Sequence, residues 1–182
     1  MKSLIAVIVG VLALALVFTI SNEWVRRHTD PAPESILFGA RGSALVIDGA
    51  MLALGGQRIH LAGVDVCGPR QTSILHDIEI DFGGLSKRRL IELTNGEDIR
   101  CIWEEKDRAR VPFAECEVYG RDVSLNETMI AEGWALTSTR SLWGKNIDVD
   151  MQSLTEIQHV AQSQNRGLWG QGLLVEMCRT TK

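Results

Sequence analysis

Residues 43–67 constrain the fold of this 182-residue sequence more than any other stretch. Two glycine-containing pairs, Asp48-Gly49 and Gly55-Gly56, divide the stretch into three short runs rich in apolar residues, and the third run alternates polar with apolar positions. Two-residue connections that contain glycine are typical of β-hairpins, and strands joined in this way are neighbours in one sheet. The stretch therefore predicts three antiparallel strands in a small curled β-sheet or barrel.

The same residues carry two motifs. Ile-Asp-Gly-Ala-Met occupies positions 47–51, and Arg-Ile-His-Leu-Ala-Gly-Val-Asp-Val-Cys-Gly occupies positions 58–68. They resemble the opening motifs of the staphylococcal nuclease (thermonuclease) family, Ile-Asp-Gly-Asp-Thr and Arg-x-Arg-Leu-x-Gly-Ile-Asp-Ala-Pro-Glu. Later landmarks of that family are similar to residues 125–135 and to the Arg-Gly-Leu-Trp sequence at 166–169. The resemblance therefore covers about residues 43–170.

The rest of the chain predicts two more strands and three helices. Apolar periodicity places the strands over 98–105 and 111–119, and the helices over 86–95, 125–132 and 151–165. Ser86 is expected to cap the first helix, and Ser124 with Glu127 forms a capping box for the second. The order of elements is similar to that of the nuclease family. This resemblance implies an α+β fold, a five-stranded OB-fold barrel with three packed helices.

The resemblance also implies which positions would carry out catalysis. A calcium-dependent nuclease of this family uses carboxylates to hold the cation, a glutamate to activate water, and two arginines to bind the phosphate. By motif, the metal ligands fall on Ala50 and Asp65, the general base falls on Gly68, and the arginines fall on His60 and Val111. Only Asp65 keeps the residue type that the chemistry needs. The resemblance therefore implies a degenerate catalytic site without a cofactor.

An active hydrolase with displaced residues is the alternative. In that case Asp65 would hold calcium, His60 in its protonated form would bind an anion, and Arg110 would reach the phosphate from beside the second arginine position. For His60, a strand residue that faces solvent is favoured over an anion-binding role.

The tripeptide Tyr-Gly-Arg at 119–121 matches a family motif, but its context differs. In the family this tripeptide precedes the last long strand, whereas here it follows the strand predicted over 111–119. Arg121 is therefore expected to be an exposed turn residue.

The amino terminus predicts a membrane segment. Residues 4–20 form an uncharged, largely apolar run that follows Lys2 and could just span a bilayer as a helix. An uncleaved signal-anchor transmembrane helix over 1–28 is favoured over a cleaved signal peptide, because no small-x-small cleavage site follows the run. A linker over 29–42 and a tail over 171–182 would then flank the folded domain, which is expected to be periplasmic or otherwise extracytoplasmic.

The four cysteines have no Cys-x-x-Cys spacing, so they suggest neither zinc nor a redox motif. Cys101 and Cys116 fall on the two strands that flank one turn and are expected to face each other. They form a disulfide if the domain lies in an oxidising compartment, or two small apolar core residues otherwise. The state of Cys67 and Cys178 does not follow from the sequence.

The charge of the chain argues against general nucleic-acid binding. The whole sequence has 19 basic and 23 acidic residues, and without residues 1–28 the remainder has 16 basic and 22 acidic residues, a net charge of −6. Non-specific binding to nucleic acid depends on the neutralisation of phosphates by Lys and Arg. Nucleic acid is therefore not expected as a non-specific ligand.

These observations lead to two hypotheses. The first is a membrane-anchored, catalytically defective nuclease-like domain that binds or scaffolds a protein or oligosaccharide partner. Resemblance to small nuclease-like proteins of exopolysaccharide synthesis implies a role in the bacterial envelope. The second is an active metal-dependent endonuclease or phosphodiesterase that uses calcium. Trp103, Trp134 and Trp169 offer stacking faces for bases or sugars, but their places at strand and helix ends are typical of core residues.

Overall fold

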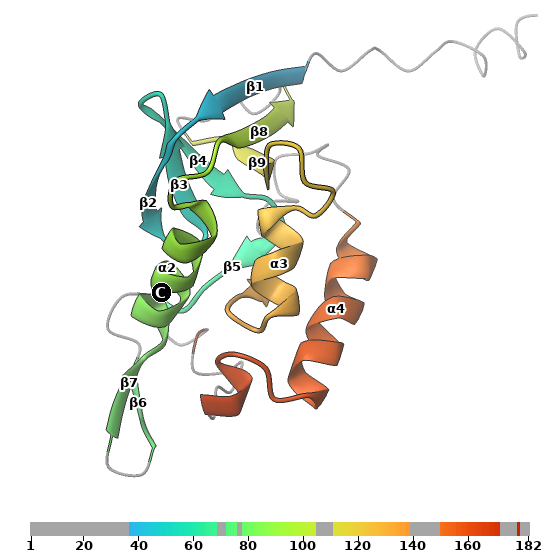
Figure 1. The fold of residues 1–182 in the computed structure, drawn as a ribbon. Helices are drawn as coiled ribbons and strands as arrows, with labels where there is room; N and C mark the ends of the chain where they lie inside the picture. The colour runs from blue at the N-terminus through green and yellow to red at the C-terminus, as the bar shows by residue number, and fades with distance from the viewer. Residues whose placement is uncertain are drawn as a thin grey trace, which may run out of the picture. The chain divides into compact units, whose positions relative to one another are not determined.

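The computed structural model of the chain describes residues 37–68, 72–75, 78–104, 111–138, 150–171 and 178 (Figure 1). All of them belong to one unit, residues 36–182. The predicted transmembrane helix over 1–28 lies outside the described residues. Among those that are described, no helix is both long enough and apolar enough to cross a membrane.

The stretch 43–67 contains three antiparallel strands in sequence order, as predicted. They are β2 (Ala44–Asp48), β3 (Met51–Leu54) and β4 (Gln57–Leu61). Successive side chains of a strand point to opposite faces, so alternate apolar residues of β3 and β4 are buried on one face. These residues are Leu52, Leu54, Ile59 and Leu61.

The meander is part of a six-stranded sheet in the order β1-β8-β9-β4-β3-β2. The additional strands are β1 (Leu37–Gly42), β8 (Ile99–Glu104) and β9 (Phe113–Val118). The outermost strands of this order, β1 and β2, follow each other in the chain with only Ser43 between them. The two ends of the sheet are therefore joined through one bent stretch of chain. Together with the helices, this mixed α+β arrangement fits an OB-like fold.

Strand β1 lies in the segment that the sequence predicted as a linker, residues 29–42. Most of its side chains are exposed, so the sequence shows no alternation of polar and apolar residues there. The strand forms because it pairs with β8 over its whole length, from Leu37 opposite Glu104 to Gly42 opposite Ile99. Gly42 has φ of 145°, a value that favours glycine, and allows the chain to bend into β2.

Three α-helices accompany the sheet in the described residues: α2 (Phe82–Thr94), α3 (Leu125–Ala131) and α4 (Met151–Ser163). The predicted start of the first helix at Ser86 is wrong. Asp81 caps this helix, because its Oδ1 accepts from the Gly84 amide at 2.9 Å. Ser86 is buried one turn inside, where its hydroxyl donates to the Trp134 carbonyl at 2.6 Å.

The connection before α2 contains regular secondary structure. Part of it forms a hairpin of β6 (Thr72–Leu75) and β7 (Ile78–Asp81). At α3 the predicted cap is confirmed, since the Ser124 hydroxyl accepts from the Glu127 amide at 3.1 Å.

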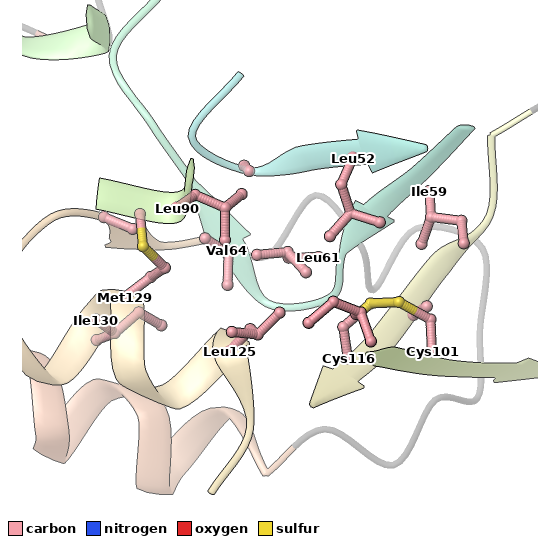
Figure 2. Packing of buried hydrophobic residues seen from close by; sticks show 14 of the residues in the cluster. Leu52, Ile59, Leu61, Val64, Leu90, Cys101, Cys116, Leu125, Met129 and Ile130 are labelled. Atoms are coloured by element: carbon pink, nitrogen blue, oxygen red, sulfur yellow. A yellow bond between two sulfur atoms is a disulfide. The ribbon is translucent and has the colours of Figure 1, made fainter. Parts of the chain in front are cut away.

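The main core joins the meander to α2 and α3. Figure 2 shows its apolar side chains gathered between the strands and the helices, with the disulfide between Cys101 and Cys116 at one side. These two cysteines are paired across β8 and β9 with a Cα–Cα distance of 4.1 Å, and neither is exposed. Besides the two cysteines, the labelled core residues are Leu52, Ile59, Leu61, Val64, Leu90, Leu125, Met129 and Ile130.

A second core connects the C-terminal part of the domain to α2. A disulfide joins Cys67 to Cys178, across 111 positions of sequence. Phe82, Leu168 and Trp169 pack in the same cluster, and the Leu168 amide donates to the Gly133 carbonyl at 2.9 Å. The Arg-Gly-Leu-Trp landmark therefore holds the chain after α4 against the end of α3.

One buried side chain fixes the contact between β4 and β9. These strands are parallel and pair only at His60 with Phe113 and at Leu61 with Ala114. Immediately beyond, the Asn126 side chain accepts from the Cys116 amide at 3.0 Å and donates to the carbonyls of Ala62 and Ala114 at 2.8 and 3.1 Å. Asn126 thus satisfies backbone groups at the point where the two strands separate.

We expect Asn126→Ala to lower the free energy of unfolding by about 3 kcal/mol, because it leaves buried backbone groups without partners and opens a small cavity. Equilibrium unfolding in urea measures this change. Asn95→Ala, at an exposed position, serves as the control and should cost less than about 0.5 kcal/mol. Equal effects of the two substitutions would contradict the role given to Asn126.

The Cys101–Cys116 disulfide should contribute about 3 kcal/mol to stability, the value typical of a loop of 15 residues. Urea unfolding of Cys101→Ala/Cys116→Ala measures this contribution. A Cys67→Ala/Cys178→Ala chain keeps the Cys101–Cys116 disulfide, so a reductant should destabilise that chain by a similar amount. A chain with all four changes should not respond to the reductant, and a response would count against this assignment.

Candidate functional site

A hollow of about 690 Å³ opens between the β2–β3 turn, β4, β5 (Val64–Asp65) and the first turns of α2. Four of the five positions indicated by the motifs line it, namely Ala50, His60, Asp65 and Gly68. The fifth, Val111, does not line this hollow. It precedes Pro112, whose carbonyl accepts from the His60 amide at 2.9 Å, so it lies beside β4. Arg110 lies outside the described residues.

The first motif forms the turn on one side of the hollow. Asp48 accepts from the Ala50 amide at 2.8 Å through its Oδ1, so its carboxylate holds the turn closed. The Ala50 carbonyl accepts from the Leu61 amide at 2.8 Å, and only 1% of Ala50 is exposed. Position 50 is therefore part of the apolar core as well as of the wall, and its methyl group cannot bind a cation.

Gly49 brings this turn against α2. A Cβ atom at position 49 would lie 2.5 Å from the Ser86 Cβ and 3.1 Å from a methyl group of Val66. No side chain can be accommodated there without movement of the helix or the turn. The glycine of the Ile-Asp-Gly motif is thus needed for packing, whether or not the domain is catalytic.

His60 is held by two neighbours. Its Nδ1 lies 3.0 Å from the Leu61 carbonyl, and because a carbonyl oxygen only accepts, Nδ1 carries the hydrogen. Its ring lies 4.9 Å from the Phe113 ring, centroid to centroid. In the neutral form the remaining nitrogen, Nε2, is an acceptor. The imidazole therefore offers one acceptor in place of the forked donor that an arginine would present to phosphate.

Three carboxylates line the hollow, and each has an oxygen bound to a backbone amide. Asp48 binds the Ala50 amide, Asp65 accepts from the Val66 amide at 3.0 Å, and Asp81 caps α2. Lys87 is the one lysine or arginine among the described lining residues. The described lining residues therefore have more acidic than basic side chains.

A metal ion finds few ligands among these residues. Within the ranges that the structure describes, no group of three or more His, Cys, Asp or Glu side chains is placed to hold one. Asp65 is the one carboxylate that the family motif assigns to calcium.

Helix α2 is fixed by an ion pair with α3. Arg89 donates from Nε and Nη2 to the Glu132 carboxylate at 2.6 and 2.8 Å, and from Nη1 to Glu92 at 2.9 Å. The hydrogen bonds to Glu132 and then to Glu92 raise the pKa of Arg89 above its already high usual value. This bidentate contact holds the helix whose first turn lines the hollow.

Arg121 forms an ion pair on the surface of the domain. Its side chain is 58% exposed and pairs with Glu97 at 2.6 Å in the turn after β9. The prediction that it is an exposed turn residue is confirmed.

A family model described as staphylococcal nuclease homologue matches residues 58–171. This chain belongs to the staphylococcal nuclease homologue family. The match begins in β4 and ends with the short 3-10 helix η2 (Trp169–Gln171), so the two glycine turns and Ala50 precede it. A search of curated proteins found no match to the sequence.

In this nuclease homologue, α2 supplies a part of the hollow that the sequence did not predict. Asp81, Gly83, Gly84 and Lys87 line it because the helix begins at Phe82, four residues before the predicted cap. The available signal was an aspartate directly before Phe82, since Asp is a favoured N-cap residue. The alternation of Ile78 and Ile80 belongs to strand β7, which ends at Asp81, directly before the helix.

We expect Gly49→Ala to destabilise the domain by about 2 kcal/mol, because the new methyl group would overlap Ser86. In a Ser86→Gly background the Cβ atom in closest contact is absent, so the cost of Gly49→Ala should be smaller by about 1 kcal/mol. A double-mutant cycle measured by urea unfolding gives this coupling. Strictly additive effects would mean that the turn and α2 are not in close contact in solution.

Proposed function

We propose that this nuclease homologue is catalytically defective and acts as a binding or scaffolding module. The observation that carries the proposal is the lining of the hollow. Ala50 and Gly68 stand at the positions where the family motif has a metal ligand and the general base, and His60 stands at an arginine position.

The energetics support this proposal. Calcium takes about six to eight oxygen ligands, so Asp65 alone gives a weak site. Removal of one group that stabilises the transition state typically lowers a rate by about 100-fold or more. With the base, one metal ligand and both arginines replaced, no path for phosphodiester hydrolysis follows from the family mechanism.

Two disulfides support an extracytoplasmic location for the domain. Cys101–Cys116 and Cys67–Cys178 join sequence-distant segments, and such bonds persist in oxidising compartments. We place the domain on the outer side of a membrane, tethered by residues 1–28. It is a five-stranded barrel of the OB type if β1 and β2 are counted as one bent strand. Its partner would be a protein or an oligosaccharide of the envelope.

One observation favours the alternative of an active hydrolase. The hydrogen bond from Nδ1 of His60 leaves Nε2 as an acceptor on a residue that lines the hollow, and an imidazole of this kind can serve as a general base. In that case His60 would accept the proton of water, while Asp65 would bind calcium.

We expect the full-length chain in detergent to hydrolyse single-stranded DNA with Ca²⁺ no faster than buffer does. Restoration of the family residues by Ala50→Asp, His60→Arg, Gly68→Glu and Val111→Arg should raise the rate by at least about 100-fold. Asp65→Ala in the restored chain is the control and should remove the gain. Release of acid-soluble nucleotides measures each rate, and circular dichroism checks that each variant folds.

Ca²⁺ with a nucleoside bisphosphate should raise the Tm of the restored chain and leave that of the natural chain unchanged. If the natural chain hydrolyses DNA and Asp65→Ala or His60→Ala abolishes this activity, the active hydrolase is the correct function.

A further inference from the structure

A second hollow lies on the outer face of the sheet, over β1, β8 and β9. It has a volume of about 420 Å³ and shares no lining residue with the hollow described above. The strand register explains its composition, because Leu37 lies opposite Glu104, Ile102 opposite Glu115, and Arg100 opposite Glu117. Apolar and charged side chains therefore alternate across this face. We call it the outer hollow.

The apolar part of the outer hollow is open to solvent. Leu37 is 63% exposed and Ile102 is 36% exposed, and Trp103 joins them in the lining. Exposed apolar side chains that gather in a hollow favour contact with an apolar group of a partner.

The charged part is acidic. Three glutamates and one arginine line the outer hollow, and the arginine, Arg100, already pairs with Glu117 at 2.6 Å. Within the described residues no salt bridge reaches Glu104 or Glu115. In the part of the chain that the structure describes, these two carboxylates therefore have no cation beside them.

One of these carboxylates also has an unsatisfied oxygen. Oε2 of Glu104 is buried and has no hydrogen-bond partner, and the same is true of Nε of Arg100. A buried polar atom without a partner costs free energy, and such atoms are rare in folded proteins.

The acidic surface continues beyond the outer hollow. Glu115 also lines a smaller hollow of about 160 Å³, together with Glu127 near the start of α3 and Asp150 at the start of α4. An extended segment that leaves the outer hollow in this direction would meet further carboxylates.

We propose that the outer hollow binds a protein partner through an extended segment in which arginine or lysine alternates with a large apolar residue. The apolar side chain packs on Ile102 and Leu37, and the cation donates to Glu104 and Glu115. Nucleic acid does not fit, because its phosphates would face three carboxylates. This site is separate from the hollow lined by Ala50, His60, Asp65 and Gly68, which we call the nuclease-like hollow. The proposal therefore stands whether or not the domain hydrolyses DNA.

The test uses a short fluorescein-labelled peptide of alternating leucine and arginine. Its binding to the full-length chain in non-ionic detergent is measured by fluorescence anisotropy, with detergent alone subtracted. We expect saturable binding that weakens as salt is added, and Glu104→Gln and Ile102→Ser should each raise Kd by about tenfold.

Matched controls distinguish binding at the outer hollow from non-specific binding to charged or apolar side chains elsewhere on the surface. Glu156→Gln removes an exposed carboxylate from α4, and Leu45→Ser removes an apolar side chain that is 71% exposed on β2. Both should change Kd by less than about twofold. A peptide of alternating leucine and glutamate should not bind.

Absence of saturable binding would overturn the proposal, as would equal effects of the control and hollow variants. Equal affinity for the leucine–glutamate peptide or for a labelled single-stranded DNA would overturn it as well. Circular dichroism and Tm show whether Glu104→Gln and Ile102→Ser remain folded. Asp65→Ala, in the nuclease-like hollow, should leave peptide binding unchanged.

Discussion

The buried amide of Asn126 is the contact on which the arrangement of sheet and helices depends. Strands β4 and β9 come from distant parts of the chain and pair over only two residue pairs, so their own ladder gives little stability. Asn126, at the start of α3, forms hydrogen bonds with backbone groups of β9 and of Ala62, directly after β4, at the point where the two strands separate. Because its donors and acceptor are all used inside the protein, one side chain fixes the parallel pair and the position of α3. Helix α2 is then fixed in turn by the bidentate contact between Arg89 and Glu132.

The nuclease-like hollow shows that packing and catalysis place different demands on the same motif. Gly49 is required because Ser86 of α2 lies against it, and Asp48 is required because it closes the turn. Asp48 accepts from the backbone amide of Ala50, so neither contact involves the side chain at position 50. The turn therefore keeps its form with a buried alanine at this position. The motif thus preserves the residues that the fold uses, and the proposed loss of catalysis concerns those that the fold does not use.

Negative charge is common to the hollows on this domain. The nuclease-like hollow has three aspartates and one lysine, and the outer hollow has three glutamates and one arginine. Among the described residues, the lining of each hollow thus has more acidic than basic side chains, in agreement with the net charge of the sequence. The two hollows differ in the hydrogen bonding of their carboxylates. The aspartates of the first are engaged by backbone amides, whereas Glu104 of the second has a buried oxygen without a partner.

The sequence by itself determined the meander, the family motifs, the strands β8 and β9 with their alternating polar and apolar residues, and the cap of α3 at Ser124. Each of these depends on residues close together in the chain. It also indicated which positions around Ala50 and Gly68 differ from the nuclease motif. Only the tertiary structure decided that β1 is a strand, that α2 begins at Phe82, and that Glu104 and Ile102 share a hollow. Strand β1 is stabilised by pairing with β8, about 60 residues later, and its exposed side chains leave no periodic pattern. Such contacts depend on how distant segments meet, which local spacing does not specify.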